Sequence, residues 1–139
     1  MNIHFDLHPE KEIEDTILNG LIAYNANHLP DGERIKIACY ARNESGGIIG
    51  GLKGEIYTNT LFIAHFWIDE ESRGEKLGSK LLNKVESEVR EKGVTDIYLD
   101  TFSFQARDFY LKVGFTEVGK YSGFPAKGID KYFFQKHIG

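Results

Sequence analysis

The sequence predicts an α/β domain, with helices on both faces of one mixed, mostly antiparallel sheet of six to seven strands. Strand-like and helix-like segments follow one another as strand, helix, three strands, helix, strand, helix and two strands. One helix crosses over between two strands, which makes those two strands parallel. The chain has 139 residues, of which 41% are hydrophobic, so residues 1–139 are expected to form a single domain with a sizeable core.

The N-terminal segment is expected to contain a short strand over residues 2–6 and then a helix. Pro9 and the acidic residues that follow it favour a helix start, because Pro suits the first turn and acidic groups complement the helix dipole. Apolar residues at helical spacing, from Ile13 to Ile22, form one stripe along this helix.

Three strands joined by turns follow the first helix. They are predicted by alternating or continuous apolar residues bounded by Asn, Gly and Thr, at residues 34–43, 48–57 and 61–68. The middle strand contains Gly50, Gly51 and Gly54, which indicate a bulge or the close approach of another group.

The C-terminal half continues with a helix from Leu77 to about residue 92, whose apolar residues recur at helical spacing. The remaining elements are expected as a strand at 95–101, a short helix at 105–113, and strands at 115–121 and 131–136. Pro125 and Gly128 mark the loop between the last two strands.

The segment 66–82 is the most informative part of the chain. A strand stops at an acidic turn, Arg73 follows, and a helix begins at Leu77. A helix N-terminus presents free N–H groups and positive dipole, which suits a phosphate or pyrophosphate. Gly78 is expected to let that ligand approach the backbone, and Arg73 adds positive charge. The residue order fits neither a Walker loop nor a dinucleotide-binding fingerprint.

This segment resembles the pyrophosphate loop of the GNAT N-acetyltransferases, Arg/Gln-x-x-Gly-x-Gly/Ala. Arg73 and Gly78 match its first and last positions, and Lys76 replaces the middle glycine. A second stretch, 103–115, resembles the family signature Asn-x-x-Ala-x-x-Leu/Phe-Tyr-x-Lys-x-Gly-Phe. Ser103 stands where the family usually has asparagine, while six other positions match, namely Ala106, Phe109, Tyr110, Lys112, Gly114 and Phe115. Residues 99–106 also resemble a bacterial GNAT subgroup of uncertain substrate.

The resemblance implies a GNAT-like fold in which strands 61–68 and 95–101 splay apart and admit acetyl-coenzyme A as co-substrate. The pyrophosphate is then expected on residues 73–79, and the pantetheine arm on free backbone groups of the first strand near Trp67 and Ile68. The residues assigned to the cofactor on this basis are Trp67, Ile68, Arg73, Gly74, Glu75, Lys76, Leu77, Gly78, Ser79, Ser103, Ala106, Phe109, Tyr110 and Lys112.

The chemistry implied is attack of a free amine on the acetyl thioester, in a small molecule or a peptide. Tyr110 matches the family's proton donor for the departing thiolate. The base that takes the amine's proton stays open between Glu55, His65 and Asp100. A non-catalytic acyl-CoA-binding sensor or regulatory module is the alternative function.

Composition restricts the other function classes. The net charge of −4 gives no footprint for nucleic acid and mildly favours a cationic acceptor. The five histidines are scattered and there is a single cysteine, so no metal is expected. The N-terminus has no signal-peptide pattern and no apolar run is long enough for the membrane, so a cytoplasmic protein is expected. The resemblance to the GNAT family also implies a homodimer.

Overall fold

The computed structural model describes residues 1–74 and 76–139, in two compact units formed by residues 1–32 and 33–139. The first unit contains helix α1, Lys11–Asn25, which begins after Glu10 and carries Glu12 and Glu14 in its first turn. The strand predicted at residues 2–6 is wrong, because that segment carries no strand. A lone extended segment gains no ladder hydrogen bonds, so it is not a stable strand by itself.

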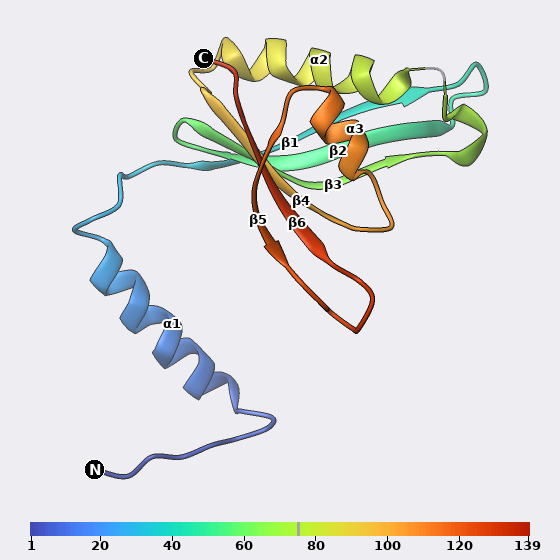
Figure 1. Ribbon diagram of the computed structural model, residues 1–139. Helices are drawn as coiled ribbons and strands as arrows, with labels where there is room; N and C mark the ends of the chain where they lie inside the picture. The colour runs from blue at the N-terminus through green and yellow to red at the C-terminus, as the bar shows by residue number, and fades with distance from the viewer. Residues whose placement is uncertain (75) are drawn as a thin grey trace. The chain divides into compact units, whose positions relative to one another are not determined.

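The second unit is built on a mixed sheet that has six strands among the described residues (Figure 1). Their bounds are β1 Arg34–Arg42, β2 Ile48–Tyr57, β3 Thr60–Ile68, β4 Asp96–Phe102, β5 Thr116–Tyr121 and β6 Lys131–His137. The strands lie side by side in the order β1-β2-β3-β4-β6-β5, and β3 and β4 form the parallel pair. The mixed, mostly antiparallel sheet predicted from the sequence is confirmed.

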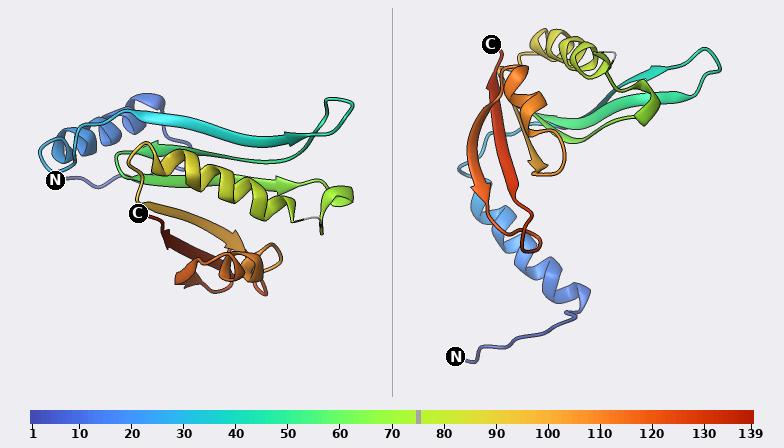
Figure 2. Two further views of the ribbon diagram at one scale, coloured as in Figure 1. Left: turned by 90° about the horizontal axis from the view of Figure 1, so that it is seen from above. Right: turned by 45° about the vertical axis from the view of Figure 1, so that its right-hand side comes forward.

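Helices α2 (Leu77–Arg90) and α3 (Arg107–Lys112) both cover the same face of this sheet (Figure 2). The core between them and the strands includes Leu82, Ile97 and Phe134, each at most 1% exposed. The prediction of helices on both faces therefore rests on α1, which belongs to the other unit, and it stays a prediction. No helix of the described residues has the length and apolar character needed to cross a membrane.

Strands β3 and β4 are paired only at one end. Their parallel register runs over Thr60, Leu61 and Phe62 of β3, opposite residues 96–98 of β4, and then stops. Beyond this point no described strand occupies that edge of β3, and the two strands diverge when seen from above (Figure 2). The splay that the family resemblance implied is thus present.

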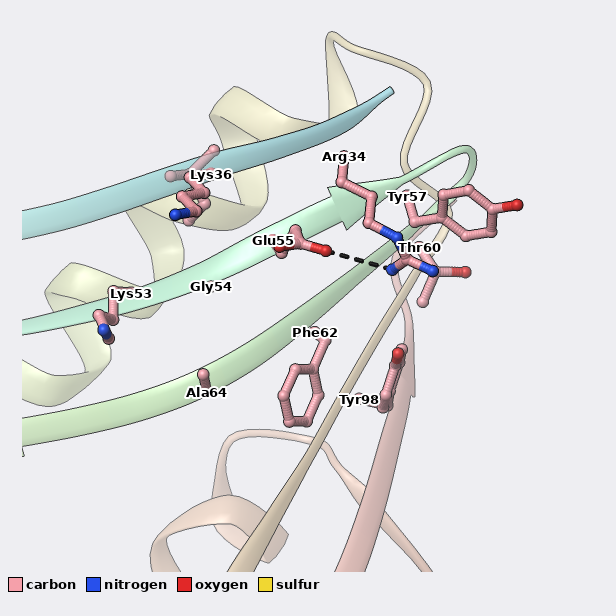
Figure 3. Close-up of a pocket in the computed structure, with 11 residues that line it drawn as sticks. Arg34, Lys36, Lys53, Gly54, Glu55, Tyr57, Thr60, Phe62, Ala64 and Tyr98 are labelled. Atoms are coloured by element: carbon pink, nitrogen blue, oxygen red, sulfur yellow. Dashed lines mark hydrogen bonds and ion pairs between the residues drawn. The ribbon is translucent and has the colours of Figure 1, made fainter. Parts of the chain in front are cut away.

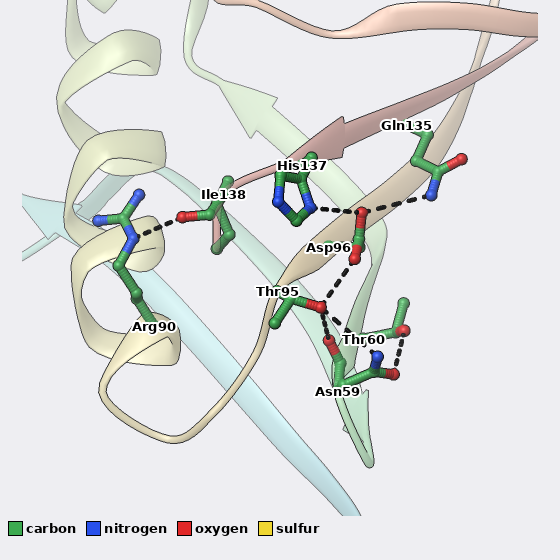
Figure 4. A network of polar contacts seen from close by, with 8 residues as sticks. All are labelled: Asn59, Thr60, Arg90, Thr95, Asp96, Gln135, His137 and Ile138. Carbon is green, nitrogen blue, oxygen red and sulfur yellow. Dashed lines mark hydrogen bonds and ion pairs between the residues drawn. The ribbon is translucent and has the colours of Figure 1, made fainter.

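The closed end of the splay is tied by a polar network (Figure 4). The Thr95 hydroxyl donates to Oδ2 of Asp96 at 2.7 Å, and His137 Nδ1 lies 3.3 Å from the other oxygen of the same carboxylate. These hydrogen bonds, with that of Thr95 first, lower the pKa of Asp96. Arg90 Nε donates to the Ile138 carbonyl at 2.8 Å, so helix α2 also holds the end of the chain.

A β-bulge interrupts β3 before the splayed end. Gly54 lies opposite Ile63 and Lys53 lies opposite His65, so Ala64 is the extra residue. A Cβ on Gly54 would lie 2.2 Å from the Phe62 carbonyl oxygen, so only glycine fits there. The bulge and close approach predicted from the glycines of this strand are confirmed at Gly54. Because the bulge shifts the side-chain alternation by one residue, the later part of β3 still directs apolar residues into the core.

Candidate active site

Arg73 is held beside the mouth of the splay. Its Nε donates to the carbonyl of Ile68, the last residue of β3, at 3.0 Å. The short 3-10 helix η1, Glu70–Ser72, turns the chain back after the strand, which brings the Arg73 side chain to the Ile68 carbonyl. The Arg73 side chain is otherwise exposed, so its positive charge is available to a ligand in the opening.

The first turn of α2 provides an uncapped helix N-terminus. Lys76 is its N-cap and makes no side-chain capping bond, and the first turn contains no acidic residue. The Lys80 N–H donates to the Lys76 carbonyl at 3.1 Å. The earlier N–H groups, those of Leu77, Gly78 and Ser79, have no acceptor within the helix, which leaves a site suited to an anion. Glu75, also predicted to contact the cofactor, lies outside the described residues.

Lys76 adopts a left-handed conformation, with φ of 62° and ψ of 19°. This explains why the family pattern has glycine at this position, a reason that the sequence alone did not reveal. Gly78 also has a packing role. A Cβ there would lie 3.2 Å from Phe109 Cζ and 3.3 Å from Ile68 Cδ1. Its missing side chain therefore makes room for the protein's own packing, and the close approach of a ligand to its backbone stays a prediction.

The unpaired edge of β3 offers backbone groups to a ligand. The Asp69 N–H donates to the Ile49 carbonyl of β2 at 2.8 Å. Because peptide groups alternate in direction along an antiparallel strand, those of Trp67 point towards β2, and those of Phe66 and Ile68 point into the gap. Ile68 is therefore suitably placed for the predicted pantetheine contact. Trp67 turns its backbone away, and its side chain is 52% exposed.

Tyr110 lies at the splayed end, on helix α3. Its side chain is 6% exposed and its ring packs among four phenylalanine rings, those of Phe66, Phe109, Phe115 and Phe134. Burial, with a smaller contribution from the charge of Asp100, raises the pKa of Tyr110 to about 12. Among the described residues, every buried side-chain N or O atom has a hydrogen-bond partner. The Tyr110 hydroxyl has no partner among those residues, so its oxygen is not buried and remains accessible to solvent.

The turn before α3 is fixed by hydrogen bonds from both sides. The Phe102 N–H donates to Oε1 of Gln105 at 2.7 Å, and Ala106 forms the N-cap of the helix. Ser103 donates its N–H to the Asp130 carbonyl at 2.8 Å and accepts from the Asp130 N–H through Oγ at 3.0 Å. Ser103, one of the residues assigned to the cofactor, thus fastens the loop between β5 and β6 to the loop that precedes α3.

The three candidate bases lie in different surroundings. Glu55 is ion-paired with Arg34 at 3.2 Å in an open pocket of about 310 Å³ (Figure 3). It lies opposite Phe62 at the closed end of the splay, on the face away from the helices. His65 is exposed beside the bulge. Asp100 lies on β4 beyond the last parallel pair, and its charge acts on Tyr110. Of the three, Asp100 is the one whose charge contributes to the raised pKa of Tyr110.

The remaining residues assigned to the cofactor lie on α3, where one is packed and another is exposed. Phe109 of α3 packs against the ring of Phe66 in β3, with ring centroids 6.0 Å apart, and lies next to Gly78, so it joins α3 to α2. Lys112 is exposed in the last turn of α3. Sequence reasoning missed Lys131, whose ammonium pairs with Asp100. Its position depends on β6 lying beside β4, and no local signal reveals that pairing.

Comparison with known proteins identifies the class of protein that this fold and site define. The family model described as Acetyltransferase (GNAT) family matches residues 4–115. The chain therefore belongs to the GNAT family of acetyltransferases.

Individual relatives agree with this assignment. The chain is 30% identical to the acetyltransferase Atu2258 of Agrobacterium fabrum, over 79% of this chain and 80% of that protein. It is 33% identical to blasticidin-S acetyltransferase of Streptomyces morookaense, over 73% of this chain and 74% of that protein. A crystal structure of an acetyltransferase from Bacillus cereus ATCC 14579 superposes with a TM-score of 0.87 at 36% identity, covering 97% of each chain.

Proposed function

We propose that the chain is an acetyl-CoA-dependent N-acetyltransferase that moves an acetyl group to a primary amine of a small molecule or peptide. The amine attacks the thioester directly while both substrates are bound. The observation that carries this proposal is the unpaired edge of β3, which has an uncapped helix N-terminus at its mouth and Tyr110 beside it. A blasticidin-S acetyltransferase among the relatives supports a small-molecule acceptor.

The cofactor half of the site fits the two ends of coenzyme A. A pyrophosphate would accept hydrogen bonds from the N–H groups of residues 77–79, with Arg73 and Lys76 supplying charge. A pantetheine arm would pair with the peptide groups of Phe66 and with the N–H of Ile68, whose carbonyl already accepts from Arg73, because an extended ligand can satisfy an unpaired strand edge.

Two residues would handle the protons. Acetyl-CoA, the co-substrate, supplies the thioester carbon that an amine attacks. Tyr110 keeps its proton through the neutral pH range and donates it as the C–S bond breaks. Asp100 is our choice of base, because it shares the splayed end with Tyr110, and it would accept the amine's proton as the new C–N bond forms.

The test is release of free coenzyme A from acetyl-CoA across a panel of amines. Tyr110→Phe should lower kcat on the order of a hundredfold, since general acid catalysis contributes ~10²–10⁴, and leave the dissociation constant of acetyl-CoA unchanged. Tyr98→Phe is the matched control, because Tyr98 is half exposed and packs on Phe62, away from the helices.

The second candidate, a non-catalytic acyl-CoA sensor, is motivated by the departures from the family pattern at Lys76 and Ser103. A sensor would bind acetyl-CoA tightly, turn over no amine, and respond to Tyr110→Phe no more than to Tyr98→Phe. That combination of results would replace the enzyme proposal with the sensor.

A further inference from the structure

Lys131, the first residue of β6, is surrounded by groups that attract a cation. Its Nζ lies 3.5 Å from Oδ1 of Asp100. The same atom lies 5.5, 5.4 and 5.9 Å from the ring centroids of Phe102, Phe124 and Phe133. Carboxylates and aromatic faces both stabilise positive charge. We call these four groups the cation cage.

The cage lies at the splayed end of β4, on the face of the sheet opposite α2 and α3. Leu99, Thr101 and Phe134 are buried under the helices, so Asp100 and Phe102, which alternate with them, point the other way. The neighbouring Thr101 hydroxyl nevertheless accepts from the N–H of Ala106, the N-cap of the helix that carries Tyr110, at 3.4 Å, and the charge of Asp100 contributes to the raised pKa of Tyr110. The cage is therefore close to the place where the proposed reaction occurs.

The cage is held in place independently of Lys131. The Phe124 N–H donates to the Ile129 carbonyl at 2.7 Å, and the Gly123 N–H donates to Oδ1 of Asp130 at 3.0 Å. The backbone of Asp130 is fastened in turn to Ser103. The Lys131 side chain has a flexible stem and is about one quarter exposed, so it can leave while the aromatic rings stay.

We infer that Lys131 is an internal stand-in for the acceptor: a cationic amine displaces it from the cage and takes its place on Asp100. This rests on the proposed function and narrows the acceptor to an organic cation. The four groups of the cage would repel or fail to bind an anion, and Lys131 is already neutralised by Asp100. Two cations do not share the cage, so Lys131 sets the affinity for the acceptor.

The experiment measures binding of tetramethylammonium, which enters an aromatic cage but accepts no acetyl group. Titrations followed by NMR would compare the unmodified protein with Lys131→Met and with Lys127→Met, which removes an exposed lysine from the same loop. Lys131→Met should bind this ion about tenfold more tightly, because one desolvated cation–aromatic contact accounts for roughly that factor. Lys127→Met should match the unmodified protein, and adding Asp100→Asn should remove most of the gain.

A second measurement needs no variant. Saturating tetramethylammonium should move the NMR signal of the Lys131 ε-methylene from its ring-shifted position towards that of an exposed lysine. Equal affinities in the three proteins, or a Lys131 signal that does not move, would overturn the inference. Because neither readout involves turnover, a chain that acetylates amines but shows no gain keeps the proposed function and loses the stand-in. A chain that binds tetramethylammonium more tightly after Lys131→Met but acetylates no amine keeps the stand-in and loses the proposed function.

Discussion

Lys76 shows how one residue can carry two opposed effects. Its ammonium adds positive charge where an anion is expected, while its left-handed backbone is strained for any residue with a Cβ. The neighbouring Gly74, with φ of 84°, adopts a similar conformation without strain. The family pattern has glycine at the position of Lys76. This chain therefore has an added positive charge there, together with a backbone conformation that is strained for lysine.

Two substitutions at Lys76 separate these effects, since Lys76→Ala and Lys76→Gly both remove the charge and only glycine relieves the strain. Lys76→Gly should be more stable than Lys76→Ala by about 1 kcal/mol, the left-handed penalty less the added chain entropy of glycine. Both should weaken acetyl-CoA binding to a similar extent. Urea unfolding and calorimetry would measure the two quantities, and equal stability of the two variants would contradict the strain.

Tyr110 gives a pH dependence with a definite sign. Its pKa is raised to about 12 in the folded protein, against 10.0 ordinarily, so the unfolded chain loses this proton first. The contribution of the protonated Tyr110 to the free energy of unfolding is therefore complete below pH 10 and is lost as the pH rises towards 12. By pH 11 the unmodified protein should have lost about 1.4 kcal/mol relative to Tyr110→Phe.

Urea unfolding of both proteins at pH 8 and pH 11 would measure that difference, and the other tyrosines cancel because both proteins contain them. Each protein is compared with itself at the lower pH, so packing lost with the hydroxyl does not enter. A stability gap that is the same at both pH values would show that Tyr110 titrates normally.

At the scale of elements, a buried ion pair joins α2 to β6 and to the end of α3. Lys136 Nζ lies 2.9 Å from Oε1 of Glu86 and donates to the Val113 carbonyl at 2.8 Å. Glu86 is 7% exposed, so its carboxylate depends on this partner. The pair fixes the helix that carries Tyr110 against the helix that begins the proposed pyrophosphate site.

Breaking this pair from one side should be far more costly than removing it. Lys136→Met leaves the Glu86 charge buried alone and should lower the free energy of unfolding by about 3 kcal/mol or more, whereas Glu86→Leu with Lys136→Met should recover most of that loss. Lys84→Met is the matched control, because it removes the exposed Lys84–Glu88 pair and should cost less than about 1 kcal/mol. A double variant no more stable than Lys136→Met alone would contradict this account.

The elements themselves were largely predictable from the sequence, because their signals are local. Apolar periodicity located α2, alternation located β1, the turn residues on either side bounded β2, and the two family-like signatures led to Arg73 and Tyr110. Long-range features were not predictable. The clamp between Ser103 and Asp130 and the cage around Lys131 both depend on the strand order β4-β6-β5, which local patterns do not encode. The sign of φ at Lys76 was hidden for another reason, since a lysine gives no hint of a left-handed backbone.

At the scale of the sheet, the splay leaves one edge of β3 without a strand partner, and the closed end holds the two strands together. At the closed end the Thr95 N–H donates to the Asn59 carbonyl at 2.8 Å, next to the three paired residues of each strand, which explains how the pair stays joined while its other half remains open. A sheet with such a gap is less stable than a continuous one, because the peptide groups along the gap pair with water. A ligand that pairs with those groups should therefore stabilise the whole unit.

Hydrogen exchange of three consecutive residues would test this arrangement. The amides of Phe66 and Ile68 face the gap and should exchange rapidly in the free protein, and acetyl-CoA should slow them. The amide of Trp67 faces β2 and should be protected in both states, which makes it an internal control. Acetyl-CoA at about a hundred times its dissociation constant should also raise the free energy of unfolding by about 2.7 kcal/mol. If Phe66 and Ile68 were already protected without ligand, or Trp67 alone responded, the gap would not be where acetyl-CoA enters the sheet.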